Sequence, residues 1–202
     1  MSELKRDRAN SMSFFKAVDG CKPVIIVMCG PSHSGKSTIA RQLMDIGKSF
    51  KVVSSDIIRE QLLISFQYGK DEDKVLSAYE SMKHRLLMTG SNIILDACCI
   101  TERARWSALQ GYSGNHKKIC IVFDLPWQTI KARYSEEKLV SFEEVRRMWS
   151  EFQRGKPGTE ELKRLGFDVV CFIRDTEDVI RAIGTIKRSF EAVGGGYKIP
   201  TR

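Results

Sequence analysis

The nine residues GPSHSGKST, from Gly30 to Thr38, place small side chains, one lysine and hydroxyl groups at a spacing suited to phosphate chemistry. They match the pattern G-x-x-x-x-G-K-[ST], and glycines there let backbone N–H groups curl around phosphate oxygens. A helix that starts at the end of such a loop adds partial positive charge. We therefore expect ATP to be bound by one continuous set of residues: Gly30, Pro31, Ser32, His33, Ser34, Gly35, Lys36, Ser37 and Thr38.

Three side chains of this loop carry separate expectations. Lys36 should reach the β- and γ-phosphates and act in catalysis, and Ser37 should bind Mg²⁺. The imidazole of His33 should point to solvent or over the phosphates, because the chemistry of the loop uses the backbone at that position.

A carboxylate with a nearby arginine follows the next predicted strand, in the stretch VVSSDIIRE. Strand C-termini of a parallel sheet face the same crevice, so Asp56 should lie near the phosphate loop. There it can take the proton of an attacking hydroxyl. Arg59, one helical turn later, can hold an anionic group of the acceptor. The competing interpretation is structural: Asp56 caps the helix and pairs with Arg59.

Asp96 and Arg133 complete the candidate site. Asp96 ends the apolar run NIILDA, where a carboxylate commonly organises Mg²⁺ through water, and it also lies on the acceptor side. A generic strand-end aspartate is the alternative. Arg133 lies in a predicted helical lid, where a cation can neutralise charge on a transferring phosphoryl group. The alternative for Arg133 is a solvated surface position.

Apolar runs that alternate with helical patterns should position these residues. Strands are predicted at 24–29, 51–54, 92–96, 117–124 and 167–173, with helices at 36–46, 56–63, 75–88, 101–112, 126–134, 141–153, 158–166 and 176–193. The pattern predicts an α/β domain with a five-stranded, mostly parallel sheet and helices on both faces. We assign an N-terminal arm to 1–22, the domain to 23–190 with a helical lid at about 126–165, and a flexible tail to 191–202.

Composition limits the class of protein. No apolar run approaches the roughly 18 residues of a membrane span, and the N-terminus lacks the apolar stretch of a secretion signal. The six cysteines include no CxxC pair. We therefore expect a cytoplasmic protein without a membrane partner. A net charge of +8 raises the odds of a polyanionic partner. The sequence leaves the oligomeric state open.

Together these stretches resemble the 5′-hydroxyl polynucleotide kinase family, the kinase modules of phage and bacterial nucleic-acid end-healing enzymes. The resemblance runs from Val24 to Ile173 and rests on six segments in the family's order: GPSHSGKST, VVSSDIIRE, IILDA, ITERAR, IVFDLPWQTIKARY and EEVRRMWSEFQ. It implies a P-loop kinase fold that uses ATP and Mg²⁺, with a nucleic-acid 5′ end as partner.

The resemblance also implies roles at matched positions. Lys36 and Ser37 match the phosphate and metal residues, and Asp56 matches the general base. Arg59 matches the arginine that contacts the phosphate of the acceptor strand. Arg133 matches a lid arginine that contacts the donor phosphates, and Asp96 matches the family's strand-end aspartate.

Three functions stay open. ATP-dependent phosphoryl transfer to a polynucleotide 5′-hydroxyl is favoured by the Asp56–Arg59 pair and the basic surplus. Ala97-Cys98-Cys99 stands where the family usually has a Thr-Asn pair, which favours a small-molecule kinase on the same scaffold. A nucleotide-dependent switch ATPase has the least support, because the sequence contains no repeat or coiled-coil heptad for assembly.

Overall fold

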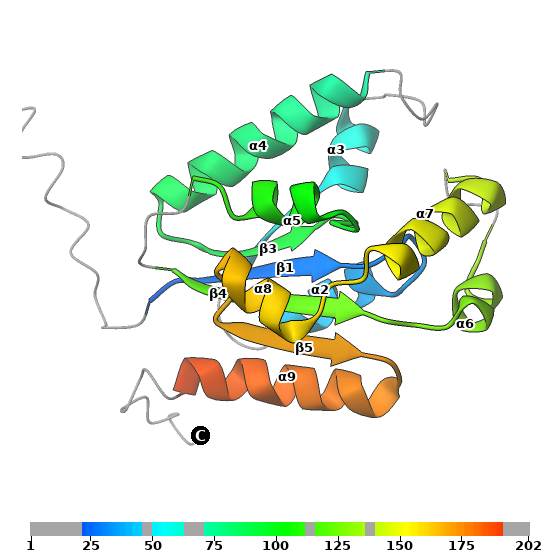
Figure 1. The fold of residues 1–202 in the computed structure, drawn as a ribbon. Helices are drawn as coiled ribbons and strands as arrows, with labels where there is room; N and C mark the ends of the chain where they lie inside the picture. Colours follow the sequence, from blue (N-terminus) through cyan, green and yellow to red (C-terminus); the bar gives the residue numbers. More distant parts are fainter. Residues whose placement is uncertain (1–21, 46–49, 63–70, 112–115, 136–139, 192–202) are drawn as a thin grey trace, which may run out of the picture.

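Five strands form the centre of the computed structural model, which describes residues 22–45, 50–62, 71–111, 116–135 and 140–191. The strands are β1 (Val24–Cys29), β2 (Phe50–Ser54), β3 (Asn92–Asp96), β4 (Lys117–Phe123) and β5 (Val169–Ile173). They pair in the order β2-β3-β1-β4-β5 and every pairing is parallel (Figure 1). The predicted α/β class and five-stranded sheet are confirmed. Apart from Lys22 and Glu191, the predicted arm and tail lie outside the described residues.

The helices in the described ranges begin and end near the predicted positions. They are α2 (Lys36–Met44), α3 (Ser55–Gln61), α4 (Glu72–Met88), α5 (Glu102–Ala108), α6 (Trp127–Ala132), α7 (Phe142–Arg154), α8 (Thr159–Leu165) and α9 (Thr176–Glu191). Side-chain caps explain several starts. Thr101 accepts from the N–H of Ala104 at 3.1 Å, and Ser141 accepts from that of Glu144 at 3.2 Å.

Two helix starts differ from the prediction. Ser54, not Asp56, caps α3, because its hydroxyl accepts from the N–H of Ile57 at 3.5 Å. Helix α4 begins at Glu72, three residues before the predicted start at Val75. Glu72 and Asp73 lie in the first turn of this helix, which suits them because carboxylates favour its positive end.

Apolar side chains bury both faces of the sheet. Every residue of β1 is buried, as expected for a central parallel strand. One face packs against α4, α5 and α8, whose core residues include Tyr79, Ala108 and Leu162. The other face packs against α2 and α9, which contribute Leu43 and Ile186. Figure 1 shows α4 and α5 on one side of the sheet and α9 on the other.

The helices α6 and α7 share a small apolar cluster of their own beyond the strand ends (Figure 1). Leu125, Ile130 and Val145 form it, and Trp127 and Trp149 pack against it. The predicted lid range also contains α8, but α8 contacts β5 and buries Leu162 in the main core. The part of that range with a separate core is therefore α6 and α7. Its action as a lid stays a prediction.

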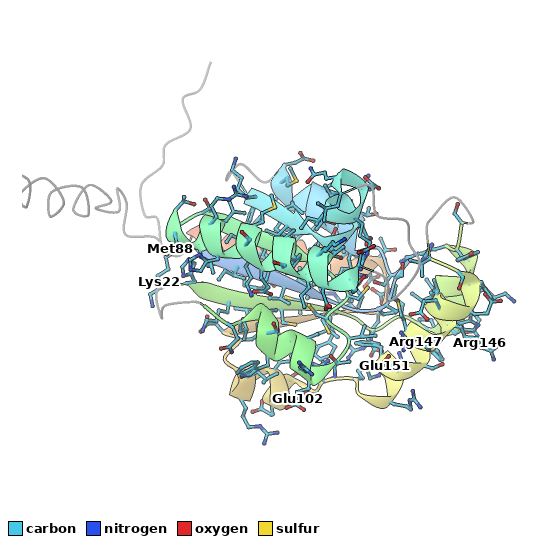
Figure 2. The ribbon with its side chains drawn as sticks, turned by 90° about the horizontal axis from the view of Figure 1, so that it is seen from above. Lys22, Met88, Glu102, Arg146, Arg147 and Glu151 are labelled. Carbon is cyan, nitrogen blue, oxygen red and sulfur yellow. The ribbon has the colours of Figure 1, made fainter. Side chains whose placement is uncertain are left out.

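The strands begin at one end of the molecule and finish at the other, and different residues lie at the two ends. In Figure 2, Lys22 and Met88 lie at one end of the molecule, where the strands begin. Arg146, Arg147 and Glu151 lie on α7 at the other end, where the strands finish. All the predicted site residues follow strand C-termini or belong to the helices next to them. Among the described residues, no helix combines the length and apolar character needed to cross a membrane.

Candidate active site

The loop after β1 is fixed by very close packing at its first residue. A Cβ added to Gly30 would lie 2.8 Å from Cβ of Phe123, at the end of the neighbouring strand β4. The N–H of Gly30 donates to the carbonyl oxygen of Cys98 at 2.9 Å. At the other end of the loop, Gly35 has a φ of 96°, a left-handed conformation that favours glycine. Both glycines of the motif are therefore required by the backbone path.

Lys36 is the first residue of α2 and points back into the loop. Its Nζ donates to the carbonyl oxygen of Pro31 at 2.7 Å, and the residue is buried. Ser37 and Thr38 follow at the exposed start of the helix. The loop thus holds an ammonium group and a helix N-terminus together, which is the arrangement expected for binding phosphate.

His33 was expected to point to solvent or over the phosphates. It is 6% exposed, so the first alternative is wrong, and a position over the phosphates stays a prediction. Its Nδ1 is 3.0 Å from Oγ of Ser32, and its ring centroid is 5.2 Å from that of Tyr134. The φ of His33 is 62°, and this left-handed conformation turns the ring toward the segment after α6. Periodicity in the sequence carries no information on this contact.

Arg133 also contacts the loop, although it lies 99 residues away from its partner in the chain. It ends α6, and its NH1 donates to the carbonyl oxygen of Ser34 at 3.0 Å. The same NH1 would lie 3.4 Å from a Cβ at Gly35. The guanidinium is therefore next to the phosphate loop, as the prediction for this residue requires.

Asp96 ends β3 and is largely buried. It pairs in register with Ser54 at the end of β2, so the two strands finish level. Burial raises the pKa of Asp96 above its usual value, and the nearby Asp56 adds to this rise. Lys36 and a hydrogen bond from Ser37 act in the opposite direction on the pKa. This carboxyl group thus lies beside both key side chains of the loop.

Asp56 and Arg59 lie on one face of α3 and are bonded to each other. NH1 of Arg59 donates to Oδ1 of Asp56 at 3.2 Å, and NH2 donates to Oε1 of Glu72 at the start of α4. The side chain of Arg59 is 10% exposed, whereas that of Asp56 is 65% exposed. The ion pair of the structural interpretation is therefore present, but Asp56 does not cap the helix. Its carboxylate still faces open space.

A cavity of about 720 Å³ connects the phosphate loop with α3 and α4. Nine of the predicted site residues line it: Ser32, His33, Gly35, Lys36, Ser37, Thr38, Asp56, Arg59 and Asp96. Four others, which are Gly30, Pro31, Ser34 and Arg133, belong to or contact the loop without lining the cavity. The structure thus brings together the residues predicted from separate segments of the sequence.

The cavity also contains residues that sequence reasoning missed. Glu72, Tyr79 and Glu80 line it from α4, and Cys98 lines it after β3. Glu72 was missed because acidic residues are common at the start of a helix and do not by themselves indicate a binding site. Cys98 was noted only as a departure from the family's pattern. Its backbone carbonyl holds the phosphate loop, and burial raises the pKa of its thiol.

Mg²⁺ fits the oxygen atoms of this cavity. Ser37 and Asp96 supply a hydroxyl and a carboxylate, and no cluster of three or more metal-binding side chains occurs in the described ranges. Mg²⁺ usually takes one or two protein ligands and completes its octahedron with water and substrate phosphates. The buried Oγ of Ser34, which has no hydrogen-bond partner among the described residues, adds a polar atom to the loop. The donor set suits a nucleotide-bound metal ion.

Fold and loop together define the class: the chain has a P-loop kinase fold, with an all-parallel sheet and a strand–loop–helix phosphate motif. A family model described as an AAA domain, AAA_33, matches residues 25–154, and the chain belongs to this family. No curated protein is significantly similar to it.

Solved structures show the same fold. A chain of the Pnkp1/Rnl/Hen1 RNA repair complex has 22% sequence identity and a TM-score of 0.59, over 70% of this chain and 47% of that one. A chain of another Pnkp1/Rnl/Hen1 structure has 25% identity and a TM-score of 0.52, over 64% and 45%. A sugar kinase from Janibacter sp. HTCC2649 has 16% identity and a TM-score of 0.60, over 86% and 99%. The protein thus spans less than half of the two repair-complex chains.

Proposed function

We propose that the protein transfers the γ-phosphoryl group of ATP to the 5′-hydroxyl of a polynucleotide. The observation that carries the transfer reaction is the shared cavity, in which a phosphate-binding loop and the exposed carboxylate of Asp56 face each other. A nucleotide on the loop and a hydroxyl at Asp56 would then meet in one cavity, as transfer between them requires.

In the proposed reaction, the acceptor oxygen forms a bond to the γ-phosphorus while the bond from that phosphorus to the β–γ bridging oxygen breaks. Asp56 takes the proton of the hydroxyl, and ADP leaves. Lys36 and Arg133 stabilise the negative charge of the phosphoryl group. Ser37, and Asp96 through water, would hold Mg²⁺, which would supply positive charge to neutralise that of the phosphates.

The polynucleotide acceptor is supported by three observations. Arg59 lies beside Asp56 and can bind an acceptor phosphate next to the reacting hydroxyl. The RNA repair complex chains above share the fold, and one of them is 25% identical to this chain. The net charge of +8 also suits a polyanion.

The test is a transfer assay with γ-labelled ATP and a panel of acceptors: 5′-hydroxyl DNA and RNA oligonucleotides, a nucleoside 3′-monophosphate, a nucleoside and simple polyols. Labelling of the oligonucleotides should depend on Mg²⁺ and disappear in Asp56→Asn. Glu60→Gln is the matched control, because it removes an exposed carboxylate from the same cavity wall. Transfer to polyols without any transfer to 5′-hydroxyl ends would refute the polynucleotide acceptor.

A small-molecule acceptor is the second candidate, and the charge of the cavity favours it. Among the described residues, four carboxylates line the α3–α4 side, those of Asp56, Glu60, Glu72 and Glu80, whereas Arg59 is its one cationic lining residue and Lys83 pairs with Glu80 from behind. Such a wall suits an uncharged or cationic alcohol. Salt separates the two candidates, because the KM for a polyanionic acceptor should rise steeply with ionic strength and that for an uncharged alcohol should not.

A further inference from the structure

Arg59 is shared between two helices. Its NH1 donates to Asp56, one turn earlier in α3, and its NH2 donates to Glu72, the first residue of α4. Asp56 is the base of the proposed reaction, so that contact serves the chemistry. Glu72 has no part in proton or phosphoryl transfer. Its carboxylate is bonded to the guanidinium of Arg59, the group that binds the acceptor phosphate in the proposed function.

Two anions compete for this guanidinium. A phosphate that reaches Arg59 comes close to the carboxylates of both Asp56 and Glu72, and like charges at such short range repel. The side chain of Arg59 is only 10% exposed, so its position is fixed by packing. That of Glu72 is 46% exposed and lies at the end of a helix. Of the two members of this ion pair, Glu72 is therefore the one with room to move.

We propose that Glu72 sets the acceptor selectivity of the site, because an anionic acceptor binds Arg59 only by displacing the Glu72 carboxylate. An uncharged alcohol reaches Asp56 without that displacement. Glu72 thus lowers the affinity for anionic acceptors and leaves the affinity for uncharged ones unchanged. This inference rests on the proposed function, since it concerns the acceptor side of the same site.

Glu60 is a suitable control for this idea. It lines the same cavity from α3 and carries the same charge, but no bond joins it to Arg59 within the described part of the chain. Replacing Glu60 by Gln changes the overall charge of the cavity by the same amount as replacing Glu72 by Gln. A difference between the two variants therefore reports the specific contact with Arg59.

The experiment compares Glu72→Gln, Glu72→Ala and Glu60→Gln with the unchanged protein. The acceptors are a nucleoside 3′-monophosphate and the corresponding nucleoside, which differ only in the phosphate. Both Glu72 variants should lower the KM for the nucleoside 3′-monophosphate about five- to tenfold, the size expected when a charged competitor is removed. The kcat and the KM values for the nucleoside and for ATP should stay within about twofold. Glu60→Gln should change every value by less than about twofold.

Direct binding separates this inference from the proposed function. Calorimetry with the nucleoside 3′-monophosphate, in the presence of ADP, needs no turnover. Tighter binding to both Glu72 variants than to Glu60→Gln supports the inference even when no acceptor is phosphorylated, an outcome that refutes only the polynucleotide kinase proposal. Equal or weaker binding to the Glu72 variants overturns it, because Glu72 then only positions Arg59. An equal gain in Glu60→Gln also overturns it, because the effect is then general charge.

Discussion

The nucleotide side and the acceptor side of the cavity are built in different ways. On the nucleotide side, strand ends and a tight loop fix the geometry through backbone bonds, such as that from Gly30 to Cys98. On the acceptor side, α3 and α4 face the cavity with charged side chains, and ion pairs through Arg59 connect them. The first side tolerates almost no change of shape. The second can change its charges without moving its backbone.

Because of this difference, the two sides respond differently to substitution. A phosphate loop that depends on close backbone packing binds one kind of ligand, a nucleoside triphosphate, in many enzymes. A wall of charged side chains on two short helix segments can be adapted to new acceptors by single substitutions.

Asp56→Asn should give the largest effect and should confine it to the acceptor side. Loss of a general base is expected to lower kcat by about 10²–10⁴-fold. The Kd for ATP, measured by calorimetry, should stay within about twofold, because Asp56 belongs to α3 and not to the loop. Glu60→Gln should retain normal kcat. Robust ATP hydrolysis that is unchanged in Asp56→Asn, without transfer to any acceptor, would instead favour the switch ATPase.

Arg133→Ala should weaken catalysis on the nucleotide side, although Arg133 is far from the phosphate loop in the sequence. Its guanidinium donates to the carbonyl oxygen of Ser34 in the loop, so its loss removes a cation next to the donor phosphates. We expect kcat/KM for ATP to fall roughly 10²-fold, the size typical of one charge-stabilising donor. Lys131→Ala removes an exposed cation from the same helix and should have little effect. Equal losses in both variants would mean that Arg133 acts only through the general charge of α6.

Gly30→Ala should test the rigid packing beneath the nucleotide side. The new Cβ would lie 2.8 Å from Cβ of Phe123, so β4 or the loop must move. Overpacking of this kind costs about 1–3 kcal/mol. In a protein of this size that corresponds to a fall in Tm of roughly 2–4 °C per kcal/mol. Gly158→Ala is the control, because a Cβ there has no heavy atom within 4 Å. A Tm for Gly30→Ala equal to that of the control would contradict the packing argument.

Sequence patterns predicted the nucleotide side better than the acceptor side. Apolar runs place all five strands, and the spacing of two glycines, Lys36 and Ser37 predicts the loop after β1. The C-terminal ends of parallel strands lie on one side of the sheet, so the sequence alone places Asp56 and Asp96 near that loop. These are consequences of periodicity and chain direction, which local sequence contains.

The missed features depend on contacts between segments far apart in the chain. His33 was expected to point to solvent or over the phosphates, and nothing in the sequence indicated that Tyr134 packs against its ring. Glu72 accepts a hydrogen bond from Arg59 because α4 starts one turn earlier than its apolar periodicity indicates. Neither contact leaves a local pattern, since each depends on how two helices or a helix and a loop pack in three dimensions. The residues of the acceptor side are therefore the ones that sequence reasoning specifies least.

Asp96→Asn should give the smallest change in stability, a pH-dependent gain. Asp96 lies at the boundary between the two sides. Burial raises the pKa of Asp96 in the folded protein, so the charged form is disfavoured relative to the unfolded chain. The unchanged protein therefore has its full stability below the unfolded pKa of about 3.9 and loses part of it as pH rises through the folded pKa. Asn carries no charge at any pH and avoids this loss.

The difference in Tm between Asp96→Asn and the unchanged protein should therefore grow as the pH is raised from about 4 to 8, in thermal unfolding without nucleotide or Mg²⁺. Phosphoryl transfer should fall in the same variant, because the proposed metal ligand is lost. A Tm difference that shrinks with rising pH would mean that Lys36 and Ser37 outweigh burial at this carboxylate. Asp96 would then stabilise the folded chain as an anion, and the boundary between the two sides would be an ion pair like the one at Arg59.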